Sequence, residues 1–477
     1  MSFNSYEFLI FLPLVWLIYW RLLQGRLYLQ NCFVLLASYV FYGWWDWRFL
    51  FLIVLSSLVD YFTGLRIGST EDKRLRKYWL WLSVAVNIGI LGIFKYYNFF
   101  VDNFVALMDS MGVYANPVTL DIVLPVGVSF YTFQTLSYTI DVYERRIEPT
   151  KDWVAFFSFV SFFPQLVAGP IERARHLLPQ FYKDRRFDYR QSVDGLRQML
   201  WGMFKKVVLA DTLAPSVDHI FGHYHEMSGG ALVLGGVLFA FQIYGDFSGY
   251  SDIAIGSARL FGFDLKPNFR TPFFSMGAFD LVRRWHISLN TWFRDYFYKY
   301  FKGKRKGVFI QAFGTFVTFL VSGLWHGAAW NFVAWGGLWG LYFMQAYYYR
   351  LYVLPRIQVQ QVWLKKISGG LLLLKTFGFI VLSLIIFRTV NFNHTYGYLS
   401  GIFNTEHFWQ MPQIIEGRYH LHFMLITLVL DFIYRKKEHS LQIGGLPKLV
   451  RWIIYIVLTI LILHYFGGEQ SFIYFQF

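Results

Sequence analysis

Two histidines of this sequence stand in stretches that suggest chemistry, and the first is His326. It lies in the uncharged run "SGLWHGAAWNF" (residues 322–332), with apolar sequence on both sides. Ionisable side chains within a bilayer are rare, and those that occur are usually paired or functional. Apolar surroundings disfavour the charged imidazolium, and the neutral ring is the form that removes a proton as a general base. The run therefore predicts either a catalytic base or a hydrogen-bonded structural histidine.

The sequence around His326 leaves space beside it. The three residues that follow, "GAA" (327–329), have small side chains, so that a ligand or another helix can approach closely. If the run is one helix, Ser322 and Trp330 lie four residues to either side of His326 and share its face. A hydroxyl and an aromatic wall suit a narrow catalytic channel, although this spacing alone does not establish one.

The second histidine, His286, lies in "LVRRWHISLNTWFRDYFYKYF" (residues 281–301). A helix over this stretch places His286, Asn290 and Arg294 on one face, at intervals of four residues. Its aromatic and apolar residues make another face. The polar stripe is either the wet face of an amphipathic helix or part of a site.

Basic residues gather in and after the same stretch. Arginine offers bidentate donors to phosphate oxygens, and lysine offers a compact charge. The cluster lies on the predicted cytoplasmic side, where a phosphate-rich acyl donor would be found. The residues predicted to bind such a donor are Arg283, Arg284, Arg294, Lys304 and Arg305.

The composition is that of a membrane protein that crosses the bilayer several times. Of its 477 residues, 56% are hydrophobic and only 15% are charged, whereas soluble domains are about half apolar and a quarter charged. The net charge of +15 comes from basic residues between apolar stretches. It indicates topogenic charge and contact with anionic lipids rather than nucleic-acid binding. The single cysteine, Cys32, excludes an intrachain disulfide.

Apolar stretches that approach the length of about 20 residues needed for a spanning helix recur along the chain. We expect an all-helical fold with about eleven transmembrane helices and further re-entrant or interfacial helices, in a single integral domain over residues 1–477. The distribution of Lys and Arg places the N-terminus outside. Residues 246–307 are too polar for lipid-exposed spans and too aromatic for a solvated loop, so they are expected at the cytoplasmic face.

The C-terminal tail (residues 471–477) ends in "FIYFQF", whereas a free chain end is normally polar and frayed. One interpretation is an anchor at the membrane interface. The other is a plug in a groove or tunnel of the protein, where the hydroxyl of Tyr474 meets the reacting centre.

Two sequence motifs resemble motifs of a known family. "RRWHISLNTWFRDY" (283–296) and "SGLWHGAAWNFVAWGGLWG" (322–340) are similar to motifs of the membrane-bound O-acyltransferases, and in particular of the bacterial alginate O-acetyltransferases and teichoic-acid D-alanyl transferases. Similarity covers most of residues 120–340 and the tail. Length and tail resemble the alginate-type branch more, although "YFYKYFKGKRKG" (296–307) departs from its pattern.

The resemblance implies a helical fold around a central tunnel. It implies transfer of an acyl group, most simply acetyl, from a cytoplasmic thioester to hydroxyls of an extracytoplasmic polysaccharide. His326 matches the family's catalytic histidine, and His286 matches its second, upstream histidine. Similar tails have been proposed to present a tyrosine as an acyl relay, which assigns that role to Tyr474.

In the mechanism that we expect, His326 removes a proton from the attacking hydroxyl, while His286 and Asn290 orient the reactants or stabilise the developing oxyanion. The donor is acetyl-CoA or a carrier-protein thioester, and neither a bound cofactor nor a metal is expected. The resemblance also implies an extracytoplasmic SGNH-type acetyltransferase or esterase-like partner. The expected location is the bacterial inner (cytoplasmic) membrane.

Other functions compete with acetyl transfer. D-Alanyl transfer to teichoic acid uses similar chemistry. A transporter or flippase explains the spans and the buried polar residues equally well, but it does not explain the "WHG" histidine and the basic entrance, and no repeated halves are detected. A membrane scaffold for a separate soluble transferase is the third class.

Overall fold

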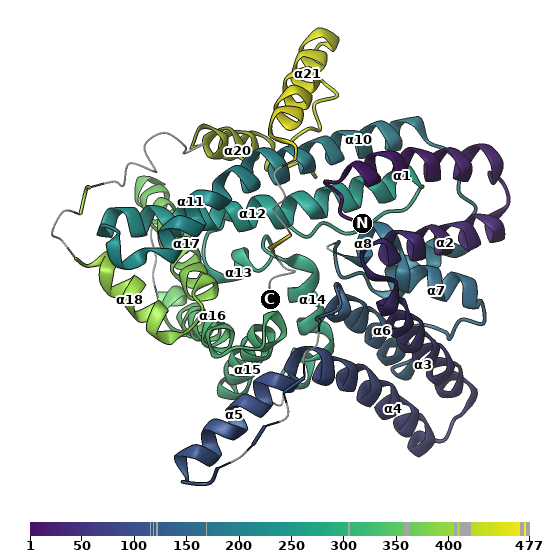
Figure 1. Cartoon of the computed structure of the whole chain (residues 1–477), viewed down its shortest axis with the longest axis horizontal. Coiled ribbons are helices and arrows are strands. Elements are labelled where there is room, and N and C mark those ends of the chain that lie inside the picture. Colours follow the sequence, from purple (N-terminus) through teal and green to yellow (C-terminus); the bar gives the residue numbers. More distant parts are fainter. Residues whose placement is uncertain are drawn as a thin grey trace. The chain divides into compact units, whose positions relative to one another are not determined.

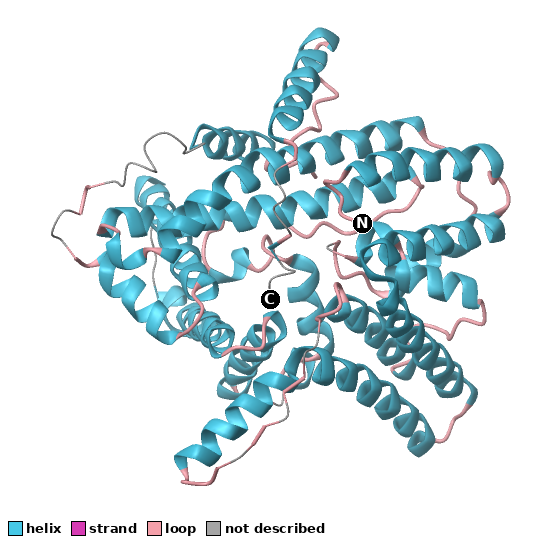
Figure 2. Ribbon diagram, in the orientation of Figure 1, coloured by secondary structure: helices cyan, strands magenta, loops and turns pink. Residues whose placement is uncertain are grey.

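The protein is described here by a computed structural model. It describes the backbone of residues 1–114, 116–117, 119–120, 123–167, 169–303, 306–356, 362–404, 408–410, 421–467 and 472–473. Within these ranges all regular structure is helical (Figures 1 and 2), which confirms the predicted all-helical fold. The chain clusters into two compact units, Met1–Leu196 with Ala254–Lys266, and Arg197–Ile253 with Pro267–Phe477. The single integral domain over residues 1–477 stays a prediction.

The first unit contains the N-terminal helices. They are α1 (Tyr6–Leu17), α2 (Leu27–Asp46), α3 (Leu50–Ser69), α4 (Lys73–Leu91), α5 (Tyr97–Ser110), α6 (Val128–Tyr143), α7 (Trp153–Ser161), α8 (Phe163–Leu166), α9 (Ala174–Leu177) and the first half of α10 (Tyr189–Met203). Three of them are joined by a buried carboxylate. Asp60 of α3 accepts hydrogen bonds from Asn87 of α4 at 2.8 Å and from Thr139 of α6 at 2.9 Å. Because a buried polar group is costly without partners, these bonds favour one alignment of the three helices.

The second unit contains the residues that the sequence analysis singles out. Its helices are α11 (Asp211–Gly222), most of α12 (Gly229–Leu260), α13 (Ala278–Leu281), α14 (Ile287–Tyr296), α15 (Val308–His326), α16 (Trp330–Tyr348), α17 (Val362–Arg388), α18 (Phe392–Ile402), α20 (Leu421–Tyr434) and α21 (Lys448–Tyr465). A π-helical segment, η5 (Phe204–Ala210), joins α10 to α11. The unit is therefore a set of long helices with two short ones, α13 and α14, between α12 and α15 (Figure 1).

Helices α15 and α16 pack closely because glycines lie where their backbones meet. A Cβ atom at Gly323 of α15 would lie 2.2 Å from the carbonyl oxygen of Phe332. One at Gly336 of α16 would lie 2.3 Å from the carbonyl oxygen of Phe319. Small residues allow such close approach of helices in membranes. This contact positions the end of α15, which is His326.

The glycine contact gives a first prediction, about stability. Gly336→Ala is expected to destabilise the protein by about 1–3 kcal/mol, because the new methyl group meets backbone that has to move. The matched control is Gly337→Ala, where the nearest atom, Cδ2 of Leu320, is an ordinary 3.5 Å away. Thermal unfolding in detergent compares the two variants. Equal melting temperatures would contradict the prediction.

Several helices are long and apolar enough to cross a membrane. Among the described residues there are six such helical stretches, which are Leu27–Ser69, Lys73–Ser110, Gly229–Leu260, Val308–His326, Ile367–Arg388 and Lys448–Tyr465. They support a multi-pass membrane protein, whereas the expected number of about eleven spans is not confirmed. One reason is visible at α1, whose 12 residues and the 5 residues of the π-helical η1 (Ile18–Leu22) that continue it are fewer than the roughly 20 of a typical spanning helix.

Residues 246–307, which are expected at the cytoplasmic face, divide between several elements, and their location at that face stays a prediction. Residues 246–260 belong to α12, a candidate spanning helix of 32 residues that continues without a break to Leu260. Asp246 and Asp252 make this end of α12 polar. In the structure both carboxylates are paired with lysines of η5, so they are accommodated in the interior of the unit.

Candidate active site

His286 is held at the start of α14 by a buried hydrogen bond. Its side chain is almost fully buried, and Nδ1 lies 3.1 Å from Oδ1 of Asn268. The same Oδ1 atom accepts bonds from the backbone N–H of Ser288 at 3.3 Å and from the hydroxyl of Ser288 at 3.0 Å. His286 itself has a left-handed backbone, with φ of +44°. Backbone conformations of this kind in a residue other than glycine cluster at functional sites.

These bonds determine which nitrogen of His286 carries the proton. A backbone N–H can only donate, so the atom of Asn268 that faces Ser288 is the carbonyl oxygen. Nδ1 of His286 must then be the donor to that oxygen, which leaves the lone pair on Nε2. Burial lowers the pKa of His286 to about 3, so the ring is neutral at physiological pH.

His326 is the last residue of α15, and it is also buried. Its ring lies 5.0 Å from the ring of Trp335 and 5.6 Å from that of Phe387. The centroids of the His326 and His286 rings are 6.1 Å apart. The structure thus brings together, inside an aromatic enclosure, two histidines that are 40 residues apart in the sequence.

Two details of the predicted helix faces are wrong. Because α15 ends at His326 and Trp330 begins α16, only Ser322 shares a helix with His326. Similarly, α14 begins at Ile287, so His286 precedes the helix that carries Asn290. The side-chain amide of Asn290 donates to the carbonyl oxygen of Trp285 at 2.7 Å and thereby caps this turn.

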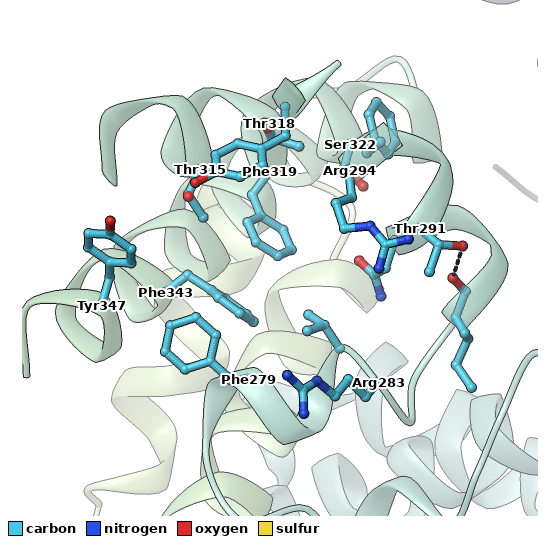
Figure 3. A pocket seen from close by; sticks show the side chains of 15 residues that line it. Phe279, Arg283, Thr291, Arg294, Thr315, Thr318, Phe319, Ser322, Phe343 and Tyr347 are labelled. Carbon is cyan, nitrogen blue, oxygen red and sulfur yellow. Dashed lines mark hydrogen bonds between the residues drawn. The ribbon is translucent and has the colours of Figure 1, made fainter. Parts of the chain in front are cut away.

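A pocket of about 380 Å³ lies between helices α13, α14, α15 and α16. Figure 3 shows Arg283 and Arg294 extending into it beside the rings of Phe279, Phe319 and Phe343. The complete lining is Phe279, Val282, Arg283, Ile287, Asn290, Thr291, Phe293, Arg294, Tyr298, Thr315, Thr318, Phe319, Ser322, Phe343 and Tyr347. Ser322 lies one turn of α15 before His326, so one wall of the pocket leads to the helix end that carries the histidine.

The predicted phosphate-binding residues divide into three groups. Arg283 and Arg294 line the pocket, and Arg294 also pairs with Asp295 at 2.7 Å. Arg284 does not line it, because its guanidinium group pairs with Asp280 at 2.9 Å. Lys304 and Arg305 lie outside the described residues.

The described part of the tail is buried within the second unit. Phe472 is 1% exposed, and its ring lies 4.3 Å from that of Tyr250 and 5.9 Å from that of Phe247. The ring of Phe247 lies in turn 4.7 Å from that of His286. These contacts favour the plug over an anchor at the membrane interface. Tyr474 lies outside the described residues.

Asn268 is the residue of this site that the sequence analysis missed. It stands 18 residues before His286, in a loop, and no helical or strand period relates the two positions. The available signal was "NFRTPF" (268–273), which lies within the stretch of family similarity, residues 120–340.

The buried His286 gives a prediction about pH. Its folded-state pKa is below the value of about 6.5 for an unfolded chain, so the unfolded state takes up a proton first and the folded state loses stability as the pH falls below 6.5. Between pH 7 and pH 5 we expect His286 to lower the free energy of unfolding by about 2 kcal/mol. His286→Gln should remove it, because glutamine does not titrate. Thermal unfolding at both pH values tests this, with the exposed His223→Gln as control. An unchanged pH dependence in His286→Gln would refute it.

Fold and site together define a multi-pass helical membrane protein with a buried pair of histidines beside a pocket that has both aromatic and polar walls. Among the described residues no three His, Cys, Asp or Glu side chains are placed to bind a metal ion. The chain belongs to the membrane-bound O-acyltransferase family, whose model matches residues 147–387. It is therefore an acyltransferase, and the match includes both histidines.

Three relatives with different names are similar to this chain to different extents. A probable alginate O-acetylase of Pseudomonas aeruginosa is 36% identical over 98% of this chain and 82% of its own length. A peptidoglycan O-acetyltransferase of Helicobacter pylori is 30% identical over 100% of this chain and 97% of its own length. A teichoic acid D-alanyltransferase of Lacticaseibacillus rhamnosus is 30% identical, but over only 44% of this chain and 56% of its own length.

Proposed function

We propose that this enzyme transfers acetyl groups from a cytoplasmic thioester to hydroxyls of a cell-surface polysaccharide. The observation that carries the proposal is the pair of buried histidines, 6.1 Å apart, next to a pocket with arginines at one side. The names of the two relatives that cover nearly the whole chain, both O-acetyl transferring enzymes, support acetyl as the group transferred. We place the enzyme in the bacterial inner membrane, with an SGNH-type partner on the acceptor side.

In the proposed mechanism His326 is the general base. It takes the proton of the attacking hydroxyl, whose oxygen then bonds to the thioester carbonyl carbon. The carbon–sulfur bond breaks, and the leaving thiolate receives the proton from His326. Trp335 and Phe387 keep water away from the imidazole.

His286 and Asn290 have supporting roles in this mechanism. In the tautomer that Asn268 imposes, Nε2 of His286 can accept a hydrogen bond but cannot donate one. We therefore assign His286 to orienting the attacking hydroxyl, rather than to donating to the oxyanion. Asn290 lines the pocket and holds the turn that precedes α14, which favours a positioning role for it as well.

The pocket suits a thioester donor in which an uncharged chain links phosphate groups to the thioester. Arg283 and Arg294 can bind phosphate groups at its rim through charge-assisted bonds. The aromatic walls formed by residues such as Phe319 and Phe343 suit a narrow, uncharged arm that carries the acetyl group towards His326. Acetyl-CoA and a carrier-protein thioester share this chemistry, and either fits the proposal.

Deletion of the gene in its host tests the function directly. Ester-linked acetate on surface polysaccharide is expected to disappear and to return when the wild-type gene is supplied, while the amount of polysaccharide and its ester-linked D-alanine stay unchanged. Loss of D-alanine instead would support the teichoic-acid reaction. Loss of the polymer itself would support a transporter, and unchanged acetylation would refute the proposal.

A further inference from the structure

A buried group of charges lies where α12 passes η5. Lys206 of η5 is 1% exposed, and its Nζ atom lies 2.8 Å from Oδ1 of Asp246 and 2.7 Å from Oδ1 of Asp211. Asp246 is 2% exposed. Removing ions from water is costly, so such groups persist where each has well-placed partners. Lys206 lies between the two carboxylates and is a partner of both.

The second oxygen of Asp246 holds the end of the chain. Oδ2 accepts a hydrogen bond from the backbone N–H of Ile473 at 2.7 Å, across 227 residues of sequence. An ionised acceptor makes this bond stronger than one between neutral groups. The side chains of Phe472 and Ile473 are both buried beside it.

The ring of Phe247 lies between the anchored segment and His286. Phe247, which follows Asp246 on α12, has its ring 5.9 Å from that of Phe472 and 4.7 Å from that of His286. Tyr474 follows Ile473 directly in the sequence. The bond to Asp246 therefore fixes the residue that directly precedes Tyr474.

We propose that Asp246, paired with Lys206, is the positioning residue that anchors the C-terminal segment inside the protein, and that acyl transfer depends on this anchorage. The dependence of acyl transfer on this anchorage rests on the proposed function. Asp246 acts through the tail and does not touch the reacting atoms. Its task is to hold the segment that precedes Tyr474 in the sequence.

A second ion pair on the same helix provides the matched control. Asp252 of α12 pairs with Lys205 of η5 at 2.6 Å, and it accepts a hydrogen bond from Gln198 at 2.8 Å. It resembles Asp246 in its helix and in its lysine partner, and its side chain is 14% exposed, compared with 3% for Asp246. Among the described residues, however, its bonds are to Lys205 and Gln198 and not to the tail.

Maleimide labelling of the full-length protein tests the anchorage. Because Cys32 is the only cysteine, Cys32→Ala with Ile473→Cys places one thiol in the buried tail, and the substitution keeps the backbone N–H. Asp246→Ala is expected to raise the labelling rate at least about tenfold, whereas Asp252→Asn should leave it within about twofold of the parent. Asp246→Asn keeps an acceptor oxygen without its charge and should give a smaller rise. Unchanged labelling in every folded Asp246 variant would overturn the proposal.

Transfer kinetics in proteins with the native tail test the consequence. Asp246→Ala is expected to lower kcat for acetyl transfer at least about tenfold and to leave KM for the thioester unchanged, because the donor pocket does not contain Asp246. Asp252→Asn should retain the parent's kcat. Faster labelling with an unchanged kcat would overturn the dependence of transfer on the anchor. A parent enzyme that transfers no acetyl would refute the proposed function, while labelling would still decide whether Asp246 anchors the tail.

Discussion

Replacing His326 by alanine is expected to reduce acetyl transfer about 10²- to 10⁴-fold without unfolding the protein. The magnitude is that of a general base whose proton transfer is lost. His326→Gln should be as inactive, since glutamine fills similar space but takes no proton. The stability of both variants should remain measurable, because the ring of His326 packs among aromatic residues that keep their other contacts.

The measurement is ester-linked acetate on the host polysaccharide, together with thioester turnover in membranes, at matched amounts of each variant. His439→Ala is a suitable control, because His439 is also a buried histidine of the second unit and is not part of the site. Transfer by His326→Gln above about a third of the wild-type rate would exclude His326 as the essential base.

Replacing Tyr474 by phenylalanine is expected to have an effect of similar size, at least about 100-fold. The change removes one oxygen atom and keeps the aromatic ring, so it separates the chemistry of the tail from its packing. If the hydroxyl carries the acetyl group, wild-type enzyme incubated with labelled acetyl thioester should retain label on the protein, and Tyr474→Phe should not. Deletion of residues 472–477 should abolish transfer as well.

The control for this experiment is Tyr396→Phe, which removes the hydroxyl of a tyrosine that is 77% exposed on α18. It should label and transfer as the wild type does. Near-normal transfer by Tyr474→Phe would mean that the acceptor hydroxyl attacks the thioester directly, and that the tail serves only as packing.

Much of the site was predictable because it is local in the sequence. Both histidines lie in short motifs whose apolar or aromatic surroundings indicate burial, and the structure buries both. The two arginines that line the pocket, Arg283 and Arg294, belong to a basic cluster that composition alone reveals. The helix starts were less accurate, because a single left-handed residue, His286, changes which side chains share a face.

The sequence by itself determined that this is a helical membrane protein of the acyltransferase family and that His286 and His326 are its candidate site residues. Hydropathy, charge and sequence motifs are properties of residues close together in the sequence, so they can be recognised without the tertiary structure. Only the tertiary structure decided that Asn268 sets the tautomer of His286 and that Asp246 binds the end of the chain. Those bonds join residues 18 and 227 positions apart, and no local pattern specifies a contact that depends on how helices pack.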